Sequence, residues 1–212
     1  MFHSTLALFD RYYRHFDAAN VASFNRDLAC EVRARLQQLT FILKRVRELE
    51  RAAEDAIARG NAAVAAHIRD LDERNLDYET EPPPDGSGVT RAEASLCHRA
   101  SFEMRLLTEA FYYFAGRIRT ILRNVKAPLP GLTNFECVGV RNTRNKLLEH
   151  PEGADSQVFA HSFSWGGKDG PVIKAVRYDG QTRAFPDRGL YENAREFSSA
   201  LNKTLDAALR DA

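Results

Sequence analysis

Apolar residues recur along the first 60 positions of the chain with the spacing of one face of a long helix. Every step between successive members is three or four residues, the period of a buried helical stripe. Gly60 stands where a helix C′ residue is expected, so the pattern predicts a helix from about Asn20 to Gly60. At ~1.5 Å per residue this helix is roughly 60 Å long and needs a long antiparallel partner. The stripe comprises Val21, Phe24, Leu28, Val32, Leu36, Leu39, Leu43, Val46, Leu49, Ala53 and Ile57.

The same period predicts the other helices, over residues 4–16, 61–77, 90–124, 133–150 and 189–209. Two of them open on capping-box sequences, Thr90-Arg-Ala-Glu93 and Thr133-Asn-Phe-Glu136, whose side chains satisfy free backbone N–H groups. The helix over 133–150 ends at His150, because Pro151 disfavours helical geometry in the residue before it. The stretch 79–89 contains three prolines and two glycines and is interpreted as a mobile linker.

The pattern changes before the last helix. Residues 157–165 and 171–178 are rich in β-branched and aromatic residues, and the glycine-rich sequence over 166–170 separates them. This is typical of a β-hairpin with a longer loop. We therefore expect a mainly α protein, a single domain over residues 1–212. It would be an elongated antiparallel helical bundle with a small β-hairpin, residues 157–178, inserted before the C-terminal helix.

Charge is distributed unevenly along the chain. The 212 residues include 30 Lys and Arg and 29 Asp and Glu, a net charge of +1. Residues 99–150, however, hold nine basic and four acidic residues, an excess of five positive charges. No apolar run has the roughly 18 residues that a membrane-spanning helix needs, and the N-terminus lacks the pattern of a signal peptide. The three cysteines are far apart, which favours a reducing cytoplasm over a disulfide framework.

Most catalytic motifs are missing from the sequence. It has no phosphate-binding Gly-x4-Gly-Lys-Ser/Thr loop, no Gly-x-Gly-x-x-Gly turn and no Gly-x-Ser-x-Gly elbow. No pair of cysteines has the spacing of zinc ligands, and the Glu-x-x-His motif of helical di-iron sites does not occur. We therefore expect no metal and no cofactor.

One segment combines the residue types that phosphodiester chemistry needs. At the end of the helix predicted over 133–150, Arg141, Arg144 and Lys146 lie close in sequence to Asn145 and His150. A histidine titrates near neutrality and suits acid–base catalysis, while an arginine can bind a phosphate and stabilise developing charge. The alternative is structural: Arg144 and His150 cap helix carbonyls and pair with Glu149 or Glu152.

The sequence Arg144-Asn145-Lys-Leu-Leu-Glu-His150 resembles the motif of the HEPN superfamily, in which an arginine and a polar residue are followed, after four to six intervening residues, by a histidine. Many HEPN proteins are metal-independent ribonucleases of toxin–antitoxin and defence systems, active where two protomers meet. The resemblance implies that Arg144 binds phosphate and stabilises the transition state, that Asn145 positions it, and that His150 acts on the 2′-hydroxyl. Arg141 and Lys146 would then be substrate-binding residues.

Three functional hypotheses follow. The first is a cytoplasmic, HEPN-like, metal-independent endoribonuclease that forms a homodimer, binds RNA and has an antitoxin or other protein partner. The second is a non-catalytic helical binding or assembly protein, in which the Arg/His motif is structural or binds an anionic ligand. The third is a site under the hairpin, using His161, Trp165 and Arg177. The run Phe111-Tyr-Tyr-Phe114 suggests a base-stacking platform, but at least two of its rings are expected to pack in the bundle.

Overall fold

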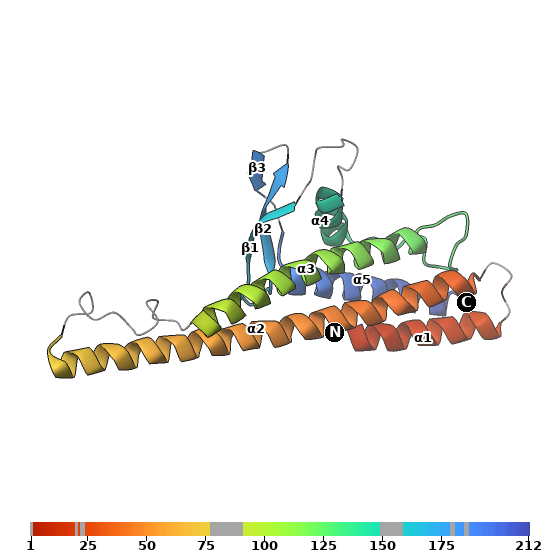
Figure 1. Ribbon diagram of the computed structural model, residues 1–212. Coiled ribbons are helices and arrows are strands. Elements are labelled where there is room, and N and C mark those ends of the chain that lie inside the picture. Colours follow the sequence, from red (N-terminus) through yellow and green to blue (C-terminus); the bar gives the residue numbers. More distant parts are fainter. Residues whose placement is uncertain are drawn as a thin grey trace. The chain divides into compact units, whose positions relative to one another are not determined.

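The computed structural model describes residues 2–19, 21, 24–76, 91–148, 159–178, 181–184 and 187–212. The side chains of residues 91, 145–148, 159–162, 176–178 and 181–184 lie outside the description. Within these ranges the chain forms α1 (Phe2–Ala18), α2 (Arg26–Arg74), α3 (Arg91–Leu122), α4 (Val138–Leu148) and α5 (Leu190–Arg210), with strands β1 (Phe159–Ser164), β2 (Val172–Tyr178) and β3 (Gln181–Ala184) (Figure 1). The prediction of a mainly α protein with a small β element before the last helix is confirmed.

The helix predicted to stop at Gly60 continues for another 14 residues, so that expectation was wrong. Gly60 is buried within α2 and is absent from the glycines with positive φ. The helix instead ends on Asn75, which has φ 53°. The N–H of Leu76 donates to the Leu71 carbonyl (2.9 Å) and that of Asn75 to the Asp72 carbonyl (3.1 Å), the pair of bonds that closes a Schellman motif.

The stripe along α2 is buried as predicted from Val32 to Ala53, whereas Ile57 is 42% exposed. The start of the helix lies at Arg26 rather than near Asn20. Asn25 caps it, because its Oδ1 accepts from the N–H of Leu28 at 3.0 Å.

The described chain divides into two compact units, residues 45–106 and residues 1–44 with 107–212. In the first, α2 and α3 run antiparallel and are joined by cross-helix contacts. Arg45 makes two hydrogen bonds to the Glu103 carboxylate (2.7 and 3.0 Å), and Arg59 Nε is 3.0 Å from Glu93 Oε1. This unit is thus a two-helix hairpin with polar pairs along its seam.

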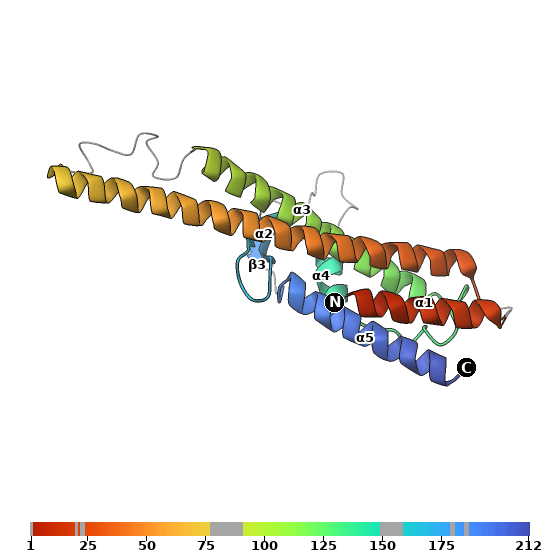
Figure 2. The same ribbon diagram turned by 90° about the horizontal axis from the view of Figure 1, so that it is seen from below.

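The core of the second unit is aromatic. Helices α1 and α5 lie side by side (Figure 2), with the rings of Phe2 and Phe197 6.0 Å apart and the hydroxyls of Thr5 and Ser198 2.7 Å apart. Phe135, in the segment between α3 and α4, packs edge-on against Phe197 at 5.3 Å. All three phenylalanines are essentially buried, so this contact region fixes the segment that leads into α4.

The β element has three strands, in the order β1-β2-β3, with both pairs antiparallel. The predicted hairpin is confirmed, and β3 is an addition that the sequence pattern did not indicate. The register of β1 is irregular around Ser162. The loop between β1 and β2 caps α5: the N–H groups of Leu190 and Tyr191 donate to the carbonyls of Pro171 and Asp169, both at 2.9 Å.

The capping box predicted at Thr133–Glu136 does not start a helix, because α4 begins at Val138. Leu132 and Phe135 are buried. Their backbone N–H groups close two turns by donating to the carbonyls of Leu129 and Leu132. The Glu136 carboxylate is engaged by arginine side chains rather than by the backbone of Thr133. Tertiary packing therefore overrides the local capping signal.

Candidate anion-binding site

Three arginines, from α3, from the residue just after it and from α4, converge on one carboxylate. Arg119 of α3 makes two hydrogen bonds to Glu136, Nε to Oε1 at 3.1 Å and Nη2 to Oε2 at 3.0 Å. Arg123, just beyond the end of α3, also donates to Oε2. Arg141 of α4 places Nη1 3.7 Å from Oε1. We call Arg119, Arg123, Arg141 and Glu136 the arginine cluster.

The arginine cluster is electrostatically unbalanced. Three guanidinium groups share a single carboxylate, so the cluster has two positive charges in excess. The hydrogen bonds from Arg119, together with the positive charges of all three arginines, lower the pKa of Glu136, although partial burial opposes this shift. The carboxylate is therefore ionised at neutral pH.

Arg144 lies one helical turn beyond Arg141 on α4. Its stem crosses Gly116 of α3 so closely that a Cβ at Gly116 would be 2.8 Å from both Cγ and Cδ of Arg144. Arg144 is partly buried there. Residues three apart on a helix have their Cβ atoms about 5–6 Å apart, so Arg141 and Arg144 belong to neighbouring parts of one basic surface.

The N-terminal end of α4 is fixed by α5. Glu196 Oε1 accepts from the backbone N–H of Gly139 at 3.3 Å and lies 3.7 Å from Cys137 Sγ. Gly139 lies so close to α5 that a Cβ atom on it would be 2.5 Å from Asn193 Oδ1. Burial raises the pKa of the Cys137 thiol to about 12, so this cysteine is not a nucleophile at neutral pH.

A buried polar network around Asp187 lies between α3, the sheet and the start of α5. Asp187 accepts from Tyr112 Oη (2.8 Å), from Asn193 Nδ2 (2.9 Å) and from the backbone N–H groups of Ile173 and Gly189 (both 3.0 Å). Burial raises the pKa of Tyr112 well above its ordinary value, and the charge of Asp187 adds to the shift. The phenol thus remains protonated and donates to Asp187, which joins α3 to the sheet and to the start of α5.

The structure accounts for the predicted site residues to different extents. Arg141 and Arg144 lie on α4 next to α3, and both are partly buried. Asn145 and Lys146 lie on the same helix, but their side chains are outside the description, as is His150 altogether. The stretch 79–89 also lies outside the described residues.

Sequence reasoning missed the arginine cluster. Arg119 and Arg123 are four residues apart at the end of the helix predicted over 90–124, which is the spacing of one helix face. The sequence pattern instead places their carboxylate partner, Glu136, in a capping box. Only the fold of residues 124–137 brings Glu136 back to the end of α3.

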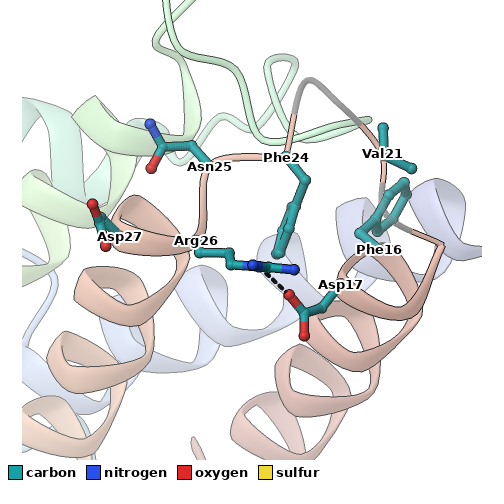
Figure 3. Close-up of a pocket in the computed structure, with 7 residues that line it drawn as sticks. All are labelled: Phe16, Asp17, Val21, Phe24, Asn25, Arg26 and Asp27. Carbon is teal, nitrogen blue, oxygen red and sulfur yellow. Dashed lines mark hydrogen bonds and ion pairs between the residues drawn. The ribbon is translucent and has the colours of Figure 1, made fainter.

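A hollow with a volume of about 430 Å³ lies at the turn between α1 and α2. Figure 3 shows Arg26 extended toward Asp17, with which it forms an ion pair, while Phe16 and Val21 form an apolar side. Two carboxylates, Asp17 and Asp27, line it with this one guanidinium. Because its two carboxylates outnumber its one guanidinium, this hollow is a poorer anion site than the arginine cluster.

The structure also describes parts of the aromatic run over 111–114 and of the proposed site under the sheet. In the aromatic run, Phe111 and Tyr112 are fully buried, as expected for at least two of the rings, while Tyr113 is 51% exposed. Phe114 lies under the Arg35 guanidinium at 5.0 Å. For the site under the sheet, Trp165 is partly buried, and the side chains of His161 and Arg177 are outside the description.

Within the described residues, no group of three or more His, Cys, Asp or Glu side chains is arranged to hold a metal ion. None of the helices described is both long and apolar enough to cross a membrane. Comparison of the chain with protein-family models, with curated proteins and with solved structures found no match.

Proposed function

We propose that this protein is a HEPN-like, metal-independent endoribonuclease that acts as a homodimer. The proposal is carried by the fixed position of Arg144, whose stem is held against Gly116 next to a cluster with excess positive charge. An arginine immobilised in this way loses little side-chain entropy when it binds a phosphate. The motif Arg144-Asn145…His150 supplies the remaining groups.

In the proposed reaction His150 removes the proton from an RNA 2′-hydroxyl. The 2′-oxygen then attacks the adjacent phosphorus, the bond to the 5′-oxygen breaks, and a proton returns to that leaving oxygen. Arg144 stabilises the negative charge on the phosphoryl oxygens, and Asn145 positions the phosphate. Arg141 and Lys146 bind the flanking backbone. The products are a 2′,3′-cyclic phosphate and a 5′-hydroxyl.

The test is cleavage of single-stranded RNA in EDTA by the wild type and by Arg144→Ala and His150→Ala. Each substitution is expected to slow cleavage by about 10²–10⁴-fold, the range of acid–base and electrostatic contributions. Arg11→Ala, an exposed change on α1, is the control and should cleave normally. RNA carrying 2′-O-methyl groups should resist cleavage. Activity that survives both substitutions, or no activity in the wild type, contradicts the proposal.

A second candidate, an anion-binding module without catalysis, is favoured by one observation. Arg141 is within ion-pair distance of Glu136, as expected of a residue with a structural role at the start of α4. The two functions separate in the same assay, because a binding module retains RNA without cleaving it. Mass measurement of the protein in solution tests the homodimer separately.

A further inference from the structure

The arginine cluster has more hydrogen-bond donors than its carboxylate can use. Each guanidinium has five N–H donors, whereas a carboxylate offers about four acceptor positions. Arg119 already takes two of these positions with its pair of bonds to Glu136. Among the described residues, Arg123 donates to Glu136, and Arg141 donates from Nε to Asn142 Oδ1 at 3.4 Å. Most of their other donors therefore face solvent or a second anion.

The cluster is open to that second anion. The side chains of Arg123 and Arg141 are 45% and 39% exposed, and that of Glu136 is 33% exposed. Arg119 is more buried, at 20%, and its paired bonds fix the carboxylate in place. The exposed side of the cluster thus consists of two guanidinium groups whose charge one internal carboxylate only partly cancels.

We propose that Arg119, Arg123 and Arg141 form a phosphate-binding subsite for the RNA backbone beside Arg144, and that Glu136 occupies it as an internal counter-ion in the absence of RNA. The ligand is the phosphodiester of a single-stranded RNA, an assignment that rests on the proposed function. Glu136 mimics that phosphate by presenting two oxygens to planar guanidinium groups. It keeps the three arginines together at the cost of weakening RNA binding.

The experiment measures binding of a 2′-O-methyl RNA oligonucleotide, which cannot be cleaved, over a range of salt concentrations. Glu136→Gln should bind RNA about five-fold more tightly than the wild type. The substitution removes the competing charge interaction between the Glu136 carboxylate and the arginines, and for partly exposed groups such an interaction contributes about 1 kcal/mol. Arg123→Ala should bind more weakly, and its plot of log K against log salt should be shallower by about 0.7, the loss of one phosphate contact.

The matched control is Glu31→Gln. Glu31 is also held by an arginine of α3, Arg117, at 2.9 and 3.3 Å, and its replacement changes the net charge of the protein equally. It should leave RNA affinity unchanged. If both glutamine variants bound RNA more tightly by the same factor, the cause would be the net charge of the protein, and the proposal would be overturned.

Folding is followed by circular dichroism and thermal unfolding. If Glu136→Gln fails to fold, Arg123→Ala decides the question, because its exposed side chain lies beyond the end of α3. An unchanged affinity and salt dependence in that variant overturns the subsite. Stabilisation by inorganic phosphate without any change in RNA affinity overturns the assignment to RNA. Because binding is measured without cleavage, the subsite and the ribonuclease proposal can fail independently.

Discussion

Arg144 of α4 crosses α3 at Gly116, with no room between the two residues for a Cβ atom. Both Cγ and Cδ of Arg144 would lie 2.8 Å from such an atom, and Nε 3.0 Å from it. A glycine inside a helix costs about 1 kcal/mol relative to alanine. Here the missing side chain lets the stem of Arg144 lie directly against the α3 backbone.

Gly116→Ala should therefore displace Arg144 while leaving the fold intact. The clash involves the middle of the Arg144 side chain, so the guanidinium must move, and the higher helix propensity of alanine offsets part of the strain. We expect RNA cleavage to fall about ten-fold or more, with a small change in thermal stability. Single-turnover cleavage and thermal unfolding measure the two effects.

The control for this prediction is Gly167→Ala, because a Cβ at Gly167 would meet nothing within 4 Å. It should cleave RNA at the wild-type rate. Wild-type cleavage by Gly116→Ala would show that the position of Arg144 over Gly116 does not matter for activity.

The pH dependence of stability should reveal the ion pairs of Glu136. The pKa of this carboxyl is lowered from the ordinary value of 4.5 in the folded protein, so its ionised form stabilises the fold. That stabilisation is complete above pH 4.5 and is lost as the pH falls through the lowered folded value. The wild type should exceed Glu136→Gln in stability at pH 7 by about 1 kcal/mol or less, since the pairs are partly exposed.

Urea unfolding at pH 7 and at several lower pH values tests this expectation. The difference between wild type and Glu136→Gln should shrink toward zero in acid. A difference that stays constant across this range would mean that the amide disturbs packing rather than charge.

Asp187→Ala should be among the most destabilising single changes to a polar residue. The substitution removes the acceptor shared by four donors, among them the buried Tyr112 hydroxyl, whereas Asn193 Nδ2 keeps the Gly189 carbonyl as an acceptor. One unsatisfied buried donor costs about 1–3 kcal/mol, so we expect a loss of about 3 kcal/mol in urea unfolding. Asp206→Ala, an exposed change on α5, should stay within about 0.5 kcal/mol of the wild type. A similarly small effect of Asp187→Ala would contradict the network.

The cysteines should differ in their reactivity toward a thiol-alkylating reagent at pH 8. Cys137 is buried and its pKa is raised to about 12, so the reactive thiolate is scarce. Cys30 is exposed and should be modified first. Mass spectrometry of partly labelled protein identifies the modified residue, and Cys137 should react only after denaturation. Rapid labelling of Cys137 in the native protein would mean that the contact between residues 137–139 and Glu196 opens readily.

The sequence by itself determined where most helical segments lie, though not all of their ends, because helix signals are local. The apolar period alone identified the buried face of α2 from Val32 to Ala53, and the Thr90–Glu93 capping sequence indicated where α3 begins, at Arg91. It also indicated the hairpin, since β-rich runs around a glycine-rich loop are recognisable without knowledge of their neighbours. The helix end at Gly60 was wrong, because glycine tolerates helical geometry and Asn75 supplies the left-handed residue.

Only the tertiary structure decided which charges meet. Glu136 is 17 residues from Arg119 and 13 from Arg123, and no periodic pattern links residues across an irregular segment. The segment is fixed by burial of Leu132 and Phe135, which depends on the packing of α1 and α5. The closeness of Arg144 to Gly116 has the same origin, because a glycine in a helical sequence does not reveal which neighbouring helix needs the space.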